Sequence, residues 1–271
     1  VLHPISQCLW ANDLDLAAGI LNGTTNYILT KMVQEGAGFE ETLRDAQRLG
    51  YAEADPTADI EGIDACRKAC ILSDLLFGKH TDPNKVFAQG ITRITAADVE
   101  AAGLVGCNIK LIGQARRMDD GKILCMVTPA LLKKEHCMAE VNDVFNAVMV
   151  HGNGVGDMMF YGRGAGDLPT ASAVLSDVIE IVRGGGRNAG IISWADEGNA
   201  HLANRRDYAI SALVRIQGLD FAAVERKFPG CERIWERDGE TAALVHSIKE
   251  GELEDALQAL NAAPYIRVFD C

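Results

Sequence analysis

The last third of the chain carries the pattern that most restricts the possible folds. Apolar alternation and turn residues between positions 206 and 271 predict the order strand, helix, strand, strand, helix, strand. The predicted segments are Tyr208–Ile216, Phe221–Phe228, Cys231–Glu236, Ala242–Ile248, Glu252–Leu260 and Tyr265–Phe269. Asp238-Gly239 lies between the two middle strands and favours a tight hairpin. This βαββαβ order is that of the ferredoxin-like split motif, so we expect a small second domain.

The preceding residues mix helices and strands, which predicts an α+β protein. A capping box is expected at Thr95 and a hairpin turn at Asp119-Asp120-Gly121. Gly184–Gly190 is the best candidate for a linker, which divides the chain into domains at 1–190 and 205–271. The expected elements are two extended segments within 4–21, helices at 22–33, 40–49, 59–78 and from 95, strands at 109–118, 122–128 and within 143–161, and a helix from 169.

Composition and charge narrow the class of protein. Of the 271 residues 48% are hydrophobic and 24% are charged, which suits a globular protein. A net charge of −12 disfavours nucleic acid and anionic membranes as partners. No transmembrane window or signal peptide is evident, and the chain begins at Val1, so we expect a cytoplasmic protein whose sequence starts inside a longer chain. The eight cysteines and six histidines show no metal-ligand spacing, so no metal site is predicted.

Residues 49–68 gather carboxylates on a turn and at a helix start, followed by a lysine. Asp64 and Lys68 are four residues apart and therefore share one helix face. The same stripe includes Ile60, Ile71 and Leu75, which predicts a buried or cleft-facing surface. An apolar wall and an adjacent carboxylate can tune a lysine for proton transfer. An ordinary ion pair on a helix surface has the same spacing, and the spacing does not decide between them.

Three further features bear on ligands. Glu53 and Asp59 could hold a cationic group such as an α-amino group, although charge at a helix start explains Asp59 as well. Asn22-Gly23-Thr24-Thr25 presents backbone N–H groups that suit a carboxylate or phosphate, and simple helix capping is the alternative. The loop at 162–166 has the spacing G-x-G-x-G, which differs from the dinucleotide fingerprint and also fits a tight turn.

Three blocks of this sequence, in this order, together resemble homoserine dehydrogenase. They are residues 19–29 (GILNGTTNYIL), residues 46–68 with Ala46, Gly50, Asp55-Pro56, Asp59, Gly62, Asp64 and Lys68, and residues 161–174 (YGRGAGDLPTASAV). The resemblance covers roughly residues 1–190. It implies a mixed sheet covered by helices, and interconversion of L-homoserine and L-aspartate 4-semialdehyde with NAD(P). The segment at 205–271 resembles the amino-acid-sensing ACT domain more weakly.

The resemblance also implies a role for particular residues. Proton transfer at the substrate hydroxyl is chemically suited to a lysine, because the hydroxyl proton must leave when hydride leaves the carbinol carbon. The implied residues are Lys68 and Asp64 for proton transfer, Glu53, Asp59, Gly23 and Thr24 for substrate binding, and Gly166 and Thr170 for the approach of the cofactor.

The sequence departs from the family at its start. The family begins with a Rossmann domain that carries G-x-G-x-x-G, a second catalytic lysine and most of the NAD(P) site, and this sequence has none of these. The helix at 170–183 would pack on that domain, and the family's sodium ion is assigned to no residue here. Two hypotheses stay open: the catalytic portion of a homodimeric homoserine dehydrogenase, inactive alone, or a non-catalytic amino-acid-binding regulator on the same fold.

Overall fold

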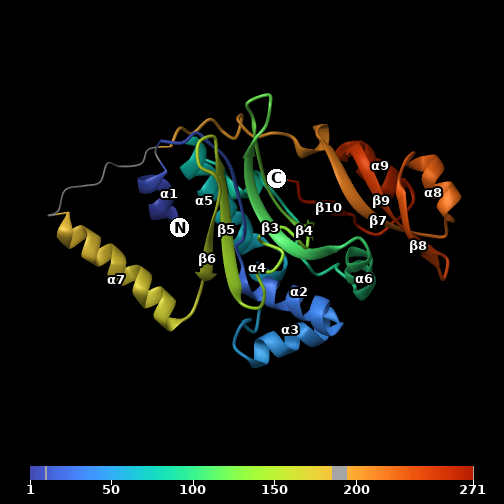
Figure 1. The fold of residues 1–271 in the computed structure, drawn as a ribbon, viewed down its shortest axis with the longest axis horizontal. Helices are drawn as coiled ribbons and strands as arrows, with labels where there is room; N and C mark the ends of the chain where they lie inside the picture. The colour runs from blue at the N-terminus through green and yellow to red at the C-terminus, as the bar shows by residue number, and fades with distance from the viewer. Residues whose placement is uncertain (10, 185–193, 271) are drawn as a thin grey trace.

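The computed structural model describes residues 1–9, 11–184 and 194–270. Within these residues ten strands form one mixed sheet in the order β6-β5-β1-β3-β4-β10-β7-β9-β8, with β2 beside β4 (Figure 1). The strands are β1 Leu14–Ile20, β2 Phe87–Ala88, β3 Cys107–Arg117, β4 Ile123–Lys133, β5 Phe145–Gly152, β6 Gly156–Arg163, β7 Ala209–Gln217, β8 Glu232–Arg237, β9 Glu240–Lys249 and β10 Ile266–Val268. The mixed sheet with covering helices confirms the predicted α+β class.

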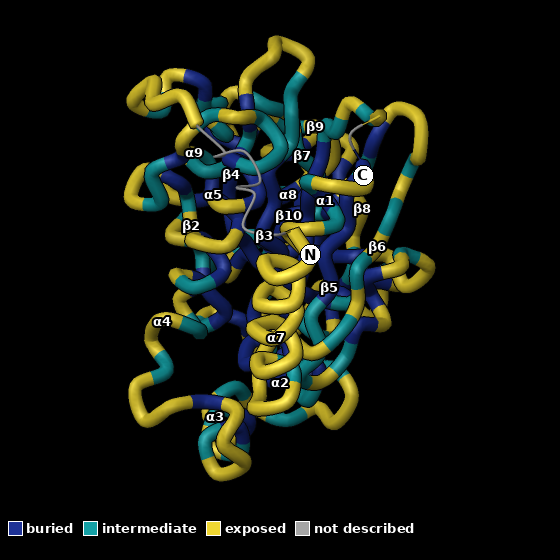
Figure 2. The backbone as a smooth tube through the Cα atoms, turned by 90° about the vertical axis from the view of Figure 1, so that its left-hand side faces the viewer, coloured by how far each residue is buried: buried dark blue, intermediate teal, exposed yellow. Residues whose placement is uncertain are grey.

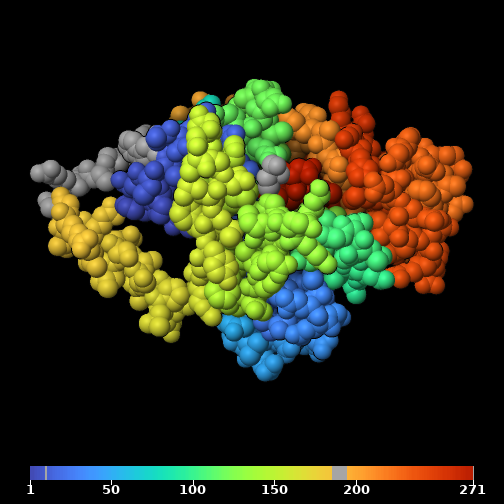
Figure 3. All heavy atoms as spheres, in the orientation of Figure 1, coloured from blue at the N-terminus to red at the C-terminus, as the bar shows by residue number. Residues whose placement is uncertain are grey.

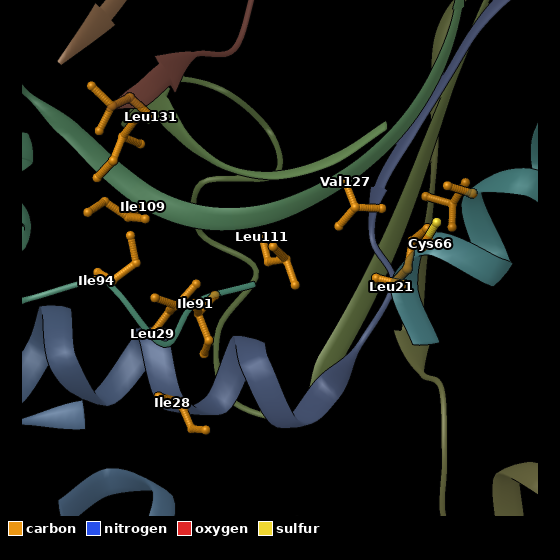
Figure 4. Close-up of a cluster of buried hydrophobic side chains, with 14 of the residues drawn as sticks. Leu21, Ile28, Leu29, Cys66, Ile91, Ile94, Ile109, Leu111, Val127 and Leu131 are labelled. Carbon is orange, nitrogen blue, oxygen red and sulfur yellow. The ribbon is translucent and has the colours of Figure 1, made fainter. Parts of the chain in front are cut away.

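Helices cover the sheet unevenly. The α-helices are α1 Leu2–Cys8, α2 Gly23–Glu35, α3 Phe39–Arg48, α4 Thr57–Ile60, α5 Ile63–Phe77, α6 Ala96–Leu104, α7 Asp167–Arg183, α8 Phe221–Lys227 and α9 Glu250–Ala259, and short 3₁₀ turns span Pro83–Lys85 and Arg205–Asp207. Helices α2, α5 and α6 pack on strands β1, β3 and β4. The main core lies between these layers, where Leu29 of α2 and Ile91 lie on the side of the helix that faces Leu111 of β3 (Figure 4).

Local signals predicted several elements correctly. The hairpin β3–β4 turns at the expected site, where Gly121 adopts a left-handed φ of 79°. Thr95 and Asp98 form the predicted capping box at the start of α6. Asn22 caps α2, because its side chain accepts a hydrogen bond from the backbone N–H of Thr25 at 2.9 Å.

Two sequence-based predictions near the N-terminal side were wrong. The first extended segment within 4–21 is the helix α1, which tolerates Pro4 in its first turn and buries Ile5 and Leu9 against the core. The single helix expected over 59–78 is two helices. Gly62 stands between α4 and α5 with a φ of 78°, and a residue in this conformation interrupts the helical path.

The C-terminal segment has the predicted βαββαβ order, and its strands lie in the order β10-β7-β9-β8. This segment is continuous with the rest of the sheet, since β10 pairs in parallel with β4 through Arg267 and Ala130. Leu213 and Ile266 also belong to the main core. Most of the linker predicted at Gly184–Gly190 lies outside the described residues, so the division at 1–190 and 205–271 stays a prediction, as does the likeness to an ACT domain.

Helix α7 is the least covered element of the fold. The helix is coloured as exposed along almost its whole length (Figure 2), and its apolar residues include Leu168, which is 83% exposed, and Val182, which is 73% exposed. Its atoms project from the body of the molecule in the space-filling view (Figure 3). An exposed apolar helix of this length marks a surface for another protein part. In the described parts of the chain, no helix has both the length and the apolar character needed to cross a membrane.

Candidate active site

A pocket of about 490 Å³ opens where α2, the 49–53 turn, α5 and the 163–166 loop meet. Seven of the eight residues implied by the resemblance line it. They are Gly23, Thr24, Glu53, Asp59, Asp64, Lys68 and Gly166. Thr170 does not line the pocket; it lies one turn into α7, where its N–H donates to the carbonyl oxygen of Gly166 at 3.0 Å. The structure therefore gathers residues from four separate sequence segments at one place.

Lys68 and Asp64 form the ion pair that their spacing predicts. The Lys68 ammonium lies 2.7 Å from Asp64 Oδ2 and donates a second hydrogen bond to the carbonyl oxygen of Leu21 at 3.1 Å. The two side chains are 48% and 32% exposed, so they lie at the wall of the pocket and not in the core. Two fixed acceptors orient the ammonium and leave its third N–H free to face a ligand.

The stripe predicted around this pair is only partly correct. Asp64 and Lys68 do face a cleft, but Ile71 is 43% exposed. The buried face of α5 is instead formed mostly by small side chains, namely Ala65, Cys66, Ala69, Cys70 and Ser73, together with Leu72 and Asp74. These residues lie on the face next to the stripe, and they let the helix approach β3 and β4 closely.

The Asn22 side chain bridges Asp59 and Asp64, and no sequence pattern predicted this contact. Its Nδ2 donates to Asp59 Oδ1 at 2.7 Å and to Asp64 Oδ2 at 3.0 Å, while its Oδ1 caps α2. One nearly buried amide therefore fixes two carboxylates from the α4–α5 region against the start of α2. The sequence signal at Asn22 is that of a helix cap alone, and this second role depends on tertiary contact.

The remaining residues of the pocket lining include hydrogen-bond donors and glycines. Asn146 on β5 and Arg163 at the end of β6 line the pocket, and sequence reasoning had assigned neither a role. A Cβ atom at Gly164 would lie 2.7 Å from Asn146 Oδ1, so any other residue there would displace the Asn146 side chain. The pocket lining therefore combines carboxylates and a lysine with amide and guanidinium side chains and glycines.

Removing the Asn22 side chain is expected to lower the free energy of unfolding by about 1–2 kcal/mol, through loss of the cap and of two hydrogen bonds to carboxylates. Urea denaturation of Asn22→Ala measures this loss. Asn22→Asp is the matched variant, because it keeps a cap acceptor but places a third carboxylate beside Asp59 and Asp64. Equal stability of Asn22→Asp and the parent at neutral pH would show that the bridge contributes nothing.

The fold and the pocket define an α+β protein with an acid–base site for a small polar molecule. A family model described as homoserine dehydrogenase matches residues 1–179. A homoserine dehydrogenase of Synechocystis is 47% identical over 74% of this chain and 45% of its own length. That of Corynebacterium glutamicum is 37% identical over the whole chain and 64% of its own length. The chain thus spans about half to two thirds of these relatives.

Solved structures agree with the sequence comparison. A crystal structure of a homoserine dehydrogenase from Thiobacillus denitrificans covers 99% of this chain with a TM-score of 0.86 and 32% identity, and 67% of that protein is matched. A hyperthermophilic archaeal homoserine dehydrogenase mutant in complex with NADPH matches 68% of the chain with a TM-score of 0.57. The chain belongs to the homoserine dehydrogenase family. Family membership favours the catalytic hypothesis over that of a non-catalytic regulator.

Proposed function

We propose that this chain is the substrate-binding and proton-transfer portion of an NAD(P)-dependent homoserine dehydrogenase, which interconverts L-homoserine and L-aspartate 4-semialdehyde. The observation that carries the proposal is the convergence of the Lys68–Asp64 pair with Glu53 and Asp59 in one pocket. In its neutral amine form Lys68 takes the hydroxyl proton of homoserine, directly or through a water, and becomes an ammonium, which returns the proton in the reverse direction. Asp64 orients the lysine side chain through the 2.7 Å hydrogen bond between its Oδ2 and the Lys68 nitrogen.

The substrate is an amino acid with a positive and a negative end, and the pocket suits both. Glu53 and Asp59 offer carboxylates to the substrate's amino and hydroxyl groups. Gly23 and Thr24 stand at the N-terminal end of α2, where backbone N–H groups favour a carboxylate. These assignments give each polar group of homoserine a partner of complementary charge.

The residues present fit only part of a nicotinamide nucleotide. Gly166 precedes α7 with a φ of 113° and borders the pocket, so it and Thr170 are the groups that would meet the cofactor. Bound NAD(P) supplies the hydride acceptor. We propose that a nucleotide-binding domain holds the rest of the cofactor and covers the exposed apolar face of α7. A homodimer and an ACT-like role for residues 205–271 are further predictions from the resemblance, and a cytoplasmic location is a further prediction from the sequence.

Joining the chain to the nucleotide-binding domain of a relative tests the proposal. The joined protein is expected to reduce L-aspartate 4-semialdehyde with NAD(P)H, while the chain alone is expected to show no turnover. L-Homoserine at about 100 times its Kd should raise the Tm of the chain alone by roughly 5 °C, since a ligand that binds only the native state stabilises it. L-2-Aminobutyrate, which lacks the hydroxyl, is the matched control ligand.

The outcomes separate the two hypotheses. Turnover by the joined protein supports the enzyme, and its absence together with a saturable Tm shift by L-homoserine would instead favour a regulator. If the joined protein shows no turnover and L-homoserine causes no Tm shift, the proposal of an amino-acid pocket is rejected.

A further inference from the structure

A buried lysine outside the pocket makes contacts that none of the roles above requires. Lys110 on β3 is only 2% exposed. Its ammonium donates to the carbonyl oxygen of Val141 at 2.6 Å, to Asn26 Oδ1 at 3.1 Å and to Asn142 Oδ1 at 3.2 Å. Three N–H groups thus meet three neutral oxygens. Burial lowers the pKa of this ammonium to about 8, which shows that the charge is costly at this position.

Asn26 extends this contact from β3 to α2. Its side chain is 1% exposed, and its Nδ2 donates to the carbonyl oxygens of Val141 at 2.9 Å and Phe145 at 3.0 Å. One turn further along α2, Thr30 Oγ1 accepts a hydrogen bond from the N–H of Asp143 at 3.1 Å. The segment 141–145 is therefore fastened to α2 on both sides of Asp143.

Asp143 needs such support, because its backbone is in an unfavourable conformation. Its φ is 54°, in the left-handed region that residues other than glycine adopt uncommonly. The hydrogen bonds that Asn26 and Lys110 donate to the segment, and the one that Thr30 accepts from the Asp143 N–H, hold the turn in this conformation. Without them the turn would relax toward a more extended path and move the residues that follow it.

Those following residues form part of the pocket. Val144 and Asn146 line it, and Gly23 of α2 faces them. A Cβ atom at Gly23 would lie 2.8 Å from the carbonyl oxygen of Val144 and 3.5 Å from Asn146 Oδ1. The two walls are thus in contact, and their spacing follows from how the 141–145 segment sits on α2.

We propose that Lys110 is a positioning residue that fixes the spacing between the Gly23–Thr24 wall and the Val144–Asn146 wall of the pocket, and thereby the affinity for the amino-acid substrate. The part of the inference that concerns the ligand depends on the proposed function. Lys110 does not touch the substrate; it acts through Asn26 and the 141–145 segment. No other lysine in the described part of the chain is classed as buried.

Lys110→Met tests this inference, because methionine keeps an unbranched apolar stem and removes the ammonium. Hydrogen exchange of the ligand-free chain is expected to become about tenfold faster at residues 141–146 and in the first turn of α2, while β7 and β9 stay unchanged. The Kd for L-homoserine, measured by calorimetry, should rise about tenfold, or about 1.4 kcal/mol. Lys31→Met is the matched control, because Lys31 lies on α2 but pairs with Glu35 at the surface.

Thr30→Val is a second variant, which leaves Lys110 in place and removes only the acceptor for the Asp143 N–H. It should change exchange and Kd in the same direction by a smaller factor. Unchanged exchange at 141–146 in both variants would overturn the inference, and so would faster exchange with an unchanged Kd. Exchange that rises throughout the chain would show a merely structural role. If the parent chain does not bind L-homoserine, the proposed function fails, and exchange at the two walls alone decides the role of Lys110.

Discussion

Replacing Lys68 by alanine in the joined enzyme is expected to lower kcat at least ~100-fold, the lower end of the usual contribution of general acid–base catalysis. Asp64 and the carbonyl oxygen of Leu21 hold the Lys68 nitrogen in place, so that as a neutral amine it can offer its lone pair to the hydroxyl proton of a bound substrate. Without Lys68, the amine that the proposed mechanism uses as the proton acceptor is missing. The rate of NAD(P)H formation from L-homoserine, followed by absorbance, measures the loss.

Two controls make this result specific. Arg67→Ala removes the neighbouring cation on the same helix, outside the pocket, and should leave kcat within about twofold, as for an exposed residue remote from the chemistry. Small primary amines in solution should partly restore the rate of Lys68→Ala, because they can accept the same proton. A kcat near that of the parent would remove Lys68 from the mechanism and leave the Asp64 pair as an ordinary surface ion pair.

Gly90→Ala is expected to lower the free energy of unfolding by about 3 kcal/mol or more, the upper range for overpacking. A methyl group at Gly90 would overlap the backbone of Ile60 and Glu61, which lie 2.8 Å or less from the ideal Cβ position. These are backbone atoms, and they cannot move aside by a simple rotation as the end of a side chain can. The turn between α4 and α5 would therefore shift, and it carries Asp59 and Asp64 into the pocket.

Urea denaturation measures this effect, and L-homoserine binding should weaken in the same variant. Gly103→Ala is the matched control, because Gly103 lies in the exposed part of α6 with nothing within 4 Å of its Cβ position. It should be neutral or stabilise the protein by up to about 1 kcal/mol, since alanine favours a helix over glycine. Equal stability of Gly90→Ala and the parent would show that the α4–α5 turn adapts to the added methyl group.

Short-range signals in the sequence predicted much of the secondary structure. The capping box at Thr95, the Asp-Gly turns and the alternation over 206–271 each depend on residues a few positions apart. The same locality explains the errors. Pro4 alone does not decide between strand and helix. At Gly62 the left-handed backbone that separates α4 from α5 lies beside a contact to a distant segment, since the Ile91 N–H donates to the Ile60 carbonyl oxygen at 2.8 Å.

Asp64 and Lys68 mark what sequence could and could not say about the candidate site. Their separation of four residues is enough to predict the ion pair, and the neighbouring blocks were enough to indicate the family. No local pattern, however, could show that Asn22 bridges Asp59 and Asp64 across a separation of about 40 residues. The roles of Asn22, Asn146 and Lys110 arise from contacts between distant segments.

The sequence by itself determined the helix caps, the hairpin turns, the βαββαβ order and the lysine–carboxylate pair, because these follow from interactions within a few residues along the chain. Only the tertiary structure decided that β10 joins β4 and extends the sheet, that Lys68 stands at a pocket wall, and that Lys110 fastens the 141–145 segment to α2. Strand order and buried hydrogen bonds depend on which segments, far apart in the sequence, pack against each other in the core. The periodicity of one segment does not show which other segment it packs against.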